Sequence, residues 1–319
     1  MPLPTGAVIG ILTDNLRKRG SVLPIPRKNA VRWAQGLGLR RGGETVIYTG
    51  MMYQLIPYIE GLVKAEKQLG DSWLANFTEL GRKMNRLVNV STFMARPSAE
   101  LRDEYNQVPI DVVRLLQKAG VDFGYLYEDD LYTGALTHDL GSDEAVAEHA
   151  KRVHEVFKKY GVKTVITIDP HTTNMLRSVY PKLLTGYDVE VKTYLEVLAE
   201  RNMPVENTLQ GELTIHDPCV FARYEGIVDE PRQLLAATGL EIKEAEKSGR
   251  MTWCCGGPVE SLYPEKAHAN AVKRAQQLGE ASSEVVTMCP MCLINLGDAA
   301  PPEVSFKDIS HYLMQAYGA

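Results

Sequence analysis

Short apolar runs alternate with longer amphipathic segments along the chain. The runs with strand character are Thr45–Thr49, Val121–Tyr127, Val162–Ile168, Leu213–Ile215, Met251–Trp253 and Val285–Met288, with weaker candidates at Leu240–Ala245 and Val304–Phe306. The segments with a helical period are Ile110–Ala119, Asp143–Tyr160, Tyr194–Arg201, Pro231–Ala237, Pro264–Ala281 and Ile309–Tyr317. Strands that alternate with helices predict an α/β fold with parallel sheets.

The second half of the chain repeats three strand-and-turn pieces of the first. The matching pairs are Thr45–Met52 with Leu213–Val220, Asp130–Gly134 with Thr252–Gly256, and Val165–Thr172 with Val285–Cys292. We therefore expect two Rossmann-like parallel-sheet halves, residues 1–203 and 204–319, joined where a helix ends before Pro204. The first half is longer between its first two pieces, which predicts a helical insertion over much of Gly61–Arg102.

All five cysteines lie in the second half, beside the ends of predicted strands. Between Cys219 and the motif Cys254-Cys255-Gly256-Gly257 lie 34 residues, and 33 residues separate Cys255 from the motif Cys289-Pro290-Met291-Cys292. The carboxyl ends of parallel strands share one edge of a sheet, so we expect the thiols to meet there. The two glycines free the backbone to turn, so that neighbouring cysteines face one side and backbone amides could bind sulfur. Pro290 suits the first position of a helix, whose positive end would lie near an anionic centre.

Five thiolates in one place require a neutralising metal centre, unless some are protonated or joined in disulfides. A zinc ion would use four of them and leave the fifth over, whereas an iron–sulfur centre suits all-thiolate ligation. We favour iron, and zinc remains an alternative. His216 could donate a hydrogen bond to a cluster sulfur or transfer a proton, with a structural hydrogen bond as the alternative. Arg223 could steady an anionic substrate or form a salt bridge, and Trp253 is expected in the core.

The overall composition narrows the functional classes. Hydrophobic residues make up 45% of the chain and the formal net charge is −5, which argues against a nucleic-acid surface. No run approaches the ~20 apolar residues of a membrane-spanning helix, and the N-terminus does not have the pattern of a signal peptide. We therefore expect a cytoplasmic protein, in whose reducing surroundings cysteines are metal ligands or redox groups before they are disulfides.

The cysteine motifs resemble those of the cysteine-rich, or CCG, domain family, and most closely the heterodisulfide reductase B/D type without an attached ferredoxin domain. The likeness includes His216–Cys219, Arg223-Tyr224 and Asp229–Arg232. It extends over nearly the whole chain, because Tyr48–Gln54 looks like the first-copy motif of the family with its cysteine replaced. The resemblance implies one noncubane 4Fe–4S cluster, whose iron ligands would be Cys219, Cys254, Cys255, Cys289 and Cys292.

The first half then carries a degenerate CCG motif. Its residues at the five cysteine positions are Met51, Tyr132, Thr133, Asp169 and Thr172. We expect this vestigial site to form a pocket lined by Tyr132, Asp169, His171 and Thr172, and we expect Met51 and Met52 to fill apolar space. Whether that pocket binds anything is left open.

The resemblance also implies a function. The chain would be the iron–sulfur redox subunit of a heterodisulfide reductase-like complex. It would exchange electrons with a thiol or disulfide substrate at the cluster, on the side of Cys219, Cys254 and Cys255. His216, Arg223, Gly256 and Gly257 would surround the cluster. A ferredoxin-like iron–sulfur subunit and a flavoprotein subunit would be partners, in the cytoplasm or at the periphery of a membrane complex. The alternative is an electron-relay or scaffold subunit of a flavin-dependent oxidoreductase complex of the glycolate or lactate oxidase type.

Overall fold

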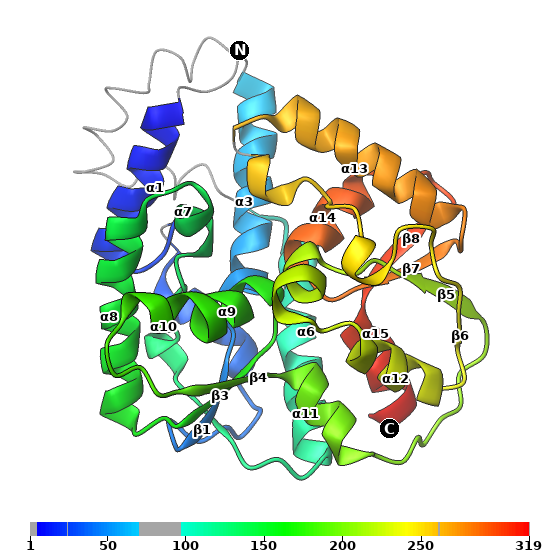
Figure 1. Ribbon diagram of the computed structural model, residues 1–319, viewed down its shortest axis with the longest axis horizontal. Coiled ribbons are helices and arrows are strands. Elements are labelled where there is room, and N and C mark those ends of the chain that lie inside the picture. The colour runs from blue at the N-terminus through cyan, green and yellow to red at the C-terminus, as the bar shows by residue number, and fades with distance from the viewer. Residues whose placement is uncertain (1–4, 24, 70–96, 261, 319) are drawn as a thin grey trace.

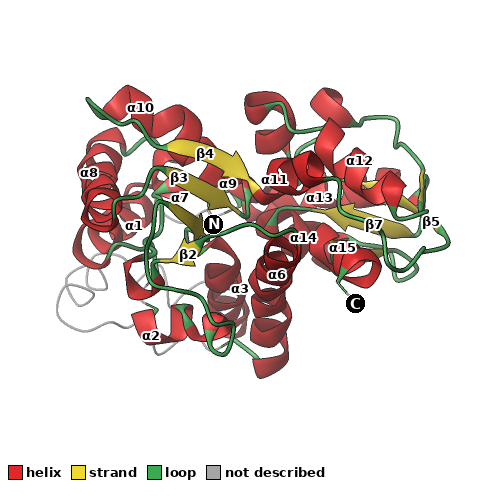
Figure 2. Ribbon diagram, turned by 90° about the horizontal axis from the view of Figure 1, so that it is seen from below, coloured by secondary structure: helices red, strands yellow, loops and turns green. Residues whose placement is uncertain are grey.

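The computed structural model describes residues 5–23, 25–69, 97–260 and 262–318, which contain two four-stranded parallel sheets (Figures 1 and 2). The first sheet has the order β2-β1-β3-β4, and the second has the order β6-β5-β7-β8. The strands are β1 (Thr45–Tyr48), β2 (Gly124–Tyr125), β3 (Thr164–Thr167), β4 (Glu190–Thr193), β5 (Glu212–Ile215), β6 (Glu241–Ile242), β7 (Glu284–Thr287) and β8 (Ser305–Asp308). This confirms the predicted α/β class with two similar halves.

Helices connect and cover the strands. They are α1 (Thr5–Arg19), α2 (Arg27–Ala30), α3 (Met52–Leu69), α6 (Ala99–Lys118), α7 (Ala135–Asp139), α8 (Asp143–Tyr160), α9 (Pro170–Asn174), α10 (Tyr180–Leu183), α11 (Tyr194–Arg201), α12 (Asp229–Ala237), α13 (Pro264–Gly279), α14 (Pro290–Ala299) and α15 (Ile309–Tyr317). Two π-helical segments, Met175–Val179 and Val220–Glu225, follow α9 and Cys219. Short 3₁₀ segments are Arg32–Ala34, Tyr127–Asp129, Gly249–Met251 and Gly257–Val259.

The two halves have the same topology. In each sheet the first strand lies between the second and the third, and the fourth strand pairs with the third. The equivalence of β1 with β5 and of β3 with β7 is the one that the repeated turn motifs predicted. The expected division between residues 203 and 204 lies in the connection from α11 to β5. One buried apolar cluster contains residues of both halves. The helices α3 and α6 lie in the middle of the molecule, against α14 and α15 (Figure 2).

Several predicted elements end where expected. Asp143–Tyr160, Tyr194–Arg201 and Ile309–Tyr317 have the predicted bounds, since their apolar periodicity stops at clear end signals. One signal is Gly161, with φ +65° after α8. Another is the capping box at the start of α11, in which Thr193 and Glu196 bond to each other's backbone N–H.

Other predictions were wrong or cannot be compared. Met251–Trp253 is not a strand, because its neighbourhood is tied by side-chain hydrogen bonds to the loop after β5 rather than to a strand ladder. Trp253 is 43% exposed and not in the core. The strand β4 was missed, since its sequence Glu-Val-Lys-Thr has only two buried side chains. The predicted insertion over Gly61–Arg102 lies largely outside the described residues, which resume at residue 97 with α6 capped by Ser98.

Candidate metal centre

The structure brings the cysteines together at the carboxyl ends of β5 and β7. All five are free thiols, and the Sγ atoms of Cys219 and Cys254 lie 3.8 Å apart, whereas those of Cys255 and Cys292 lie 3.3 Å apart. Three of the five are buried, and Cys219 and Cys254 are partly exposed. A small cavity between the two halves is lined by Cys219, Cys255, Cys289 and Cys292, together with Pro170, His171, Pro218, Val220, Pro258 and Met291.

Two of the cysteines stand at helix starts. Cys289 is the N-cap residue of α14, and Pro290 occupies the first turn as predicted. Cys292 follows in the same turn, so both thiols face the amino end of one helix. Cys219 directly precedes the π-helical segment Val220–Glu225. The positive end of the α14 dipole therefore lies at the thiol cluster.

Gly256 sets the direction of the adjacent cysteine pair. Its backbone is left-handed, with φ +88°, and its N–H donates to Cys254 Sγ at 3.3 Å. A Cβ atom here would lie 2.7 Å from the Ala267 carbonyl oxygen, so no larger residue fits without movement. The N–H of Gly257 was expected to bind sulfur. It instead lies 3.1 Å from the side-chain oxygen of Asn295, in the amide orientation in which both the oxygen and the nitrogen of Asn295 have hydrogen-bond partners. The two glycines therefore do not form a shared amide nest around sulfur.

Asp217 joins the segments that carry Cys219 and Cys254. Its carboxylate accepts two hydrogen bonds from Arg232, at 2.8 and 3.0 Å, and one from Gly249 N at 2.6 Å. Its carbonyl oxygen accepts from Thr252 Oγ1 at 2.9 Å. Arg223 was expected either to steady an anionic substrate or to form a salt bridge. Its guanidinium instead donates a hydrogen bond to the carbonyl of Thr252, two residues before Cys254.

His216 has one partnered nitrogen and one unpartnered nitrogen. Nδ1 accepts a hydrogen bond from buried Arg274 at 3.2 Å, so the ring hydrogen lies on Nε2. Nε2 is buried and has no partner among the described residues. Burial, and next the Arg274 guanidinium, lower the pKa of His216 to about 3. The ring is therefore neutral near pH 7 and suits the predicted role of hydrogen-bond donor, but not that of a proton carrier.

The thiols do not ionise together. Hydrogen bonds from Cys219 and Cys255 lower the pKa of Cys254 to about 2, and donating these bonds raises the pKa values of Cys219 and Cys255. Burial alone would raise the pKa of Cys289, but hydrogen bonds from Cys292 and His171 lower it to about 5. Full ionisation of all five thiols therefore requires positive charge from a bound centre. Within the described ranges, no three His, Cys, Asp or Glu side chains are placed to hold one metal ion.

The equivalent site of the first half is closed and holds polar side chains. Asp169 caps α9 through Thr172 N at 2.9 Å, just as Cys289 stands at the N-cap of α14. Burial raises the pKa of Asp169 to about 7. Thr133 Oγ1, Asp169 Oδ2 and Thr172 Oγ1 are buried without a hydrogen-bond partner in the described part of the chain. Met51, with φ +60°, and Met52 are buried, as expected.

The structure places three of the four residues expected to line the vestigial pocket in the interior of the first half. Tyr132, Asp169 and Thr172 are at most 1% exposed. The fourth predicted lining residue, His171, instead faces the cysteine cavity of the other half. A hollow of the first half is lined by Met51, which is one of the vestigial positions, and by residues such as Lys18, Ile25 and Leu131. Its lining includes none of the four residues expected to line the pocket.

Sequence reasoning missed His171 as a neighbour of the cysteines. Burial lowers the pKa of His171, but its hydrogen bond to the Cys289 thiolate outweighs this, and the pKa rises to about 9. The signal was present in the repeat, since His171 matches Met291, which lies between Cys289 and Cys292 of the second copy. Met291 in turn packs against the apolar core of the first half, so each half inserts this residue into the other.

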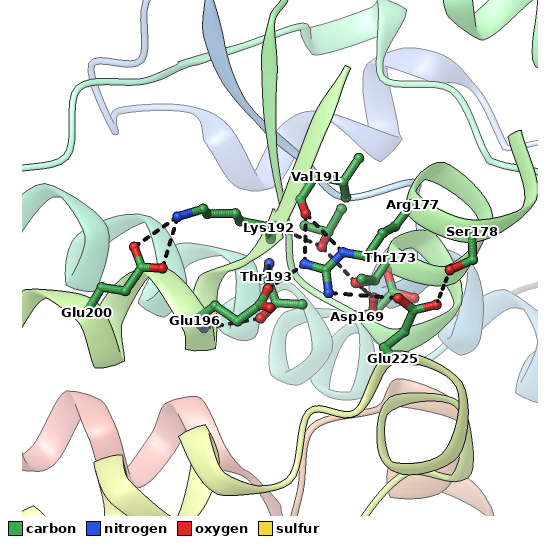
Figure 3. Close-up of polar contacts among 11 residues, drawn as sticks. Asp169, Thr173, Arg177, Ser178, Val191, Lys192, Thr193, Glu196, Glu200 and Glu225 are labelled. Atoms are coloured by element: carbon green, nitrogen blue, oxygen red, sulfur yellow. Dashed lines mark hydrogen bonds and ion pairs between the residues drawn. The ribbon is translucent and has the colours of Figure 1, made fainter. Parts of the chain in front are cut away.

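A polar network fixes the first half to the segment that follows Cys219. Glu225, whose side chain is 1% exposed, accepts hydrogen bonds from Asn174 Nδ2 at 2.7 Å and from Ser178 Oγ at 2.9 Å. Arg177 lies 3.8 Å from Glu225 and donates to the Val191 carbonyl at 2.7 and 2.9 Å. Figure 3 shows Arg177 and Ser178 of the π-helical segment after α9 beside Val191 of β4 and Glu225 of the second half. The segment bearing Cys219 is thus anchored across the boundary between the halves.

Comparison with known proteins agrees with this site. The model of a family described as "Cysteine-rich domain" matches residues 213–297. These residues belong to the CCG cysteine-rich domain family. The matched segment includes all five cysteines and the hydrogen-bonded loops around them, from β5 into α14.

Curated relatives are similar to about two thirds of the chain. An EtfAB:quinone oxidoreductase of Syntrophomonas wolfei is 33% identical over 67% of this chain and 32% of its own length. A "Probable membrane-anchored ferredoxin" of Chromohalobacter salexigens is 28% identical over 64% of this chain and 33% of its own length. The D chain of the dihydromethanophenazine:CoB–CoM heterodisulfide reductase of Methanosarcina barkeri is 26% identical over 67% of this chain and 56% of its own length.

This chain is thus similar to subunits of iron–sulfur oxidoreductases. It spans about a third of the length of the first two relatives and about half that of the third. In the parts of the chain that the structure describes, no helix combines the length and apolarity that crossing a membrane requires.

Proposed function

We propose that the chain is an iron–sulfur redox subunit and that its five cysteines hold one noncubane 4Fe–4S cluster. The ligands would be Cys219, Cys254, Cys255, Cys289 and Cys292. Residues 1–203 would form the supporting half and residues 204–319 the half that holds the cluster. The cluster would supply one-electron chemistry beside a sulfur atom of a substrate, and the protein would supply the ligands, the hydrogen bonds and the shape of the site.

The observation that carries the proposal is the donor set itself. Five free thiols meet at one sheet edge, and their mutual repulsion prevents full ionisation without added positive charge. The buried Nε2–H of His216 has no partner among the described residues, and a cluster sulfur would accept its hydrogen bond. Cysteines in close pairs, rather than around one point, suit a centre with several iron atoms.

The exposed side of the site is where we place the substrate and the partners. Cys219 and Cys254 are the partly exposed thiols, so a thiol or disulfide substrate would approach there. Tyr224, Met251 and Trp253 are 71, 69 and 43% exposed and lie in the two segments that carry these cysteines. Exposed apolar side chains of this size are typical of protein contact surfaces. A ferredoxin-like or flavoprotein subunit would cover them, in the cytoplasm or beside a membrane complex.

The direct test is anaerobic purification with quantification of iron, acid-labile sulfide and zinc. We expect about four irons per chain and a paramagnetic spectrum on reduction. Cys255→Ser should lose the iron. Thr133→Ser changes the equivalent position of the first half and should retain it, which makes it a matched control. Zinc without iron or sulfide would overturn the proposal and select a structural zinc domain.

The loss of the first-half cysteines favours a second candidate, an electron relay or scaffold in a flavin-dependent oxidoreductase complex. A chain with one cluster cannot place a disulfide between two clusters of its own. Adding thiols to the reduced protein separates the two functions. A changed paramagnetic spectrum supports substrate binding at the cluster, and an unchanged spectrum with every candidate thiol supports the relay.

A further inference from the structure

His171 belongs to the first half of the chain but lies at the cysteine site of the second. It lines the same cavity as Cys219, Cys255, Cys289 and Cys292, so its ring lies beside these sulfur atoms. Asp139, at the end of α7, is a further charged group that acts on this ring. The site is therefore built from both halves.

The turn that presents His171 is held without any metal. Asp169 accepts from Thr172 N at 2.9 Å, and Thr173 Oγ1 donates to the Asp169 carbonyl at 2.7 Å. Thr173 also bonds Thr167 on β3 at 2.7 Å, and the next residue, Asn174, bonds Glu225 of the second half. These contacts fix both ends of α9, so the backbone that carries His171 is held by protein groups.

The repeat explains why a histidine stands here. Asp169-Pro170-His171-Thr172 matches Cys289-Pro290-Met291-Cys292, and Asp169 takes over helix capping where the second half has a cysteine. The first half has replaced its ligands but has kept the turn. The turn now delivers a polar side chain to the neighbouring site.

We propose that His171 is a positioning residue of the cluster site, which donates its ring N–H to Cys289 and so favours the reduced cluster. This inference rests on the proposed iron–sulfur function. Reduction adds negative charge to the cluster and its thiolate ligands. A hydrogen bond to a ligand sulfur stabilises that charge and raises the reduction potential.

The test is a redox titration of the cluster followed by electron paramagnetic resonance. His171→Leu removes the donor, whereas His171→Asn and His171→Gln each retain an N–H. His268→Leu, an exposed histidine on α13, serves as control. We expect His171→Leu to lower the reduced-to-oxidised ratio about tenfold at a fixed potential, which corresponds to a midpoint shift of about 59 mV for one electron. At least one amide variant should recover part of this shift, and the control should show none.

The outcomes separate the two proposals. Wild-type protein without iron contradicts the proposed function. Wild-type protein with iron, whose potential is the same in all three His171 variants, contradicts only this inference. Loss of iron in all three variants also overturns it, because the residue would then hold the fold and not a hydrogen bond. If only His171→Leu loses iron, a wild-type-like potential in an amide variant supports the donor role. A midpoint lowered by about 59 mV in both amide variants contradicts it.

Discussion

Arg232 lies between two carboxylates in very different surroundings, and this offers a controlled test of what holds the cysteine loops. Asp217 is 1% exposed and Glu244 is 44% exposed, and both bond the same guanidinium. Asp217 also accepts from Gly249 N, in the segment that leads to Cys254. Replacing Asp217 with Ala therefore removes a buried anchor, whereas replacing Glu244 with Ala removes a contact near solvent.

The expected magnitudes differ several-fold. Breaking one side of a buried ion pair typically costs 3–5 kcal/mol, and because the Arg232 side chain is 19% exposed we expect about 3 kcal/mol for Asp217→Ala. Glu244→Ala should cost about 0.2–1 kcal/mol, the usual value of an exposed pair. A typical domain has only about 5–15 kcal/mol of stability, so the first variant should also hold iron poorly.

Urea denaturation of anaerobically purified protein, with iron counted before each titration, measures both effects. We expect Asp217→Ala to lower the unfolding midpoint clearly and Glu244→Ala to leave it nearly unchanged, with its iron retained. Equal losses in the two variants would refute the distinction between buried and exposed carboxylates. So would an Asp217→Ala protein within about 1 kcal/mol of wild type and with full iron content.

Two further predictions concern single positions. Burial lowers the pKa of His149 to about 4 from its ordinary 6.5. Between these two pH values His149 is therefore protonated in the unfolded state but neutral in the folded state. Wild type should therefore lose about 1.4 kcal/mol of stability between pH 7.5 and pH 5.5 relative to His149→Gln. Glutamine is the control because its amide can still bond Tyr132 O. The same change of unfolding free energy with pH in both proteins would contradict this. Gly256→Ala should abolish iron retention, because alanine would have to adopt a left-handed backbone with its Cβ against Ala267 O. Gly297→Ala is the control, because Gly297 lies in a helix with open space around it. Its iron content and stability should equal or slightly exceed those of wild type.

The turn motifs predicted the architecture because each has a direct structural cause. Pro290 after Cys289 begins a helix, and Pro170 after Asp169 does the same in the first half. Matching turns at matching distances therefore implied matching strands, and the shared sheet order confirms it. Strand lengths were harder to predict. β2 and β6 have only two residues each, although the apolar runs that predicted them are longer.

The site was predictable only as far as its parts are close in sequence. The exposure of Trp253 and the turn of Gly257 towards Asn295 depend on long-range packing, which local pattern does not encode. His171 is the clearest case. Its position between two residues that match cysteines suggested a remnant site in its own half. The two halves instead pack so that His171 reaches the cysteine cavity and Met291 reaches the apolar core of the first half. The turn after β3 therefore has the same geometry as its cysteine-bearing counterpart after β7, and it places His171 at the cysteine cavity.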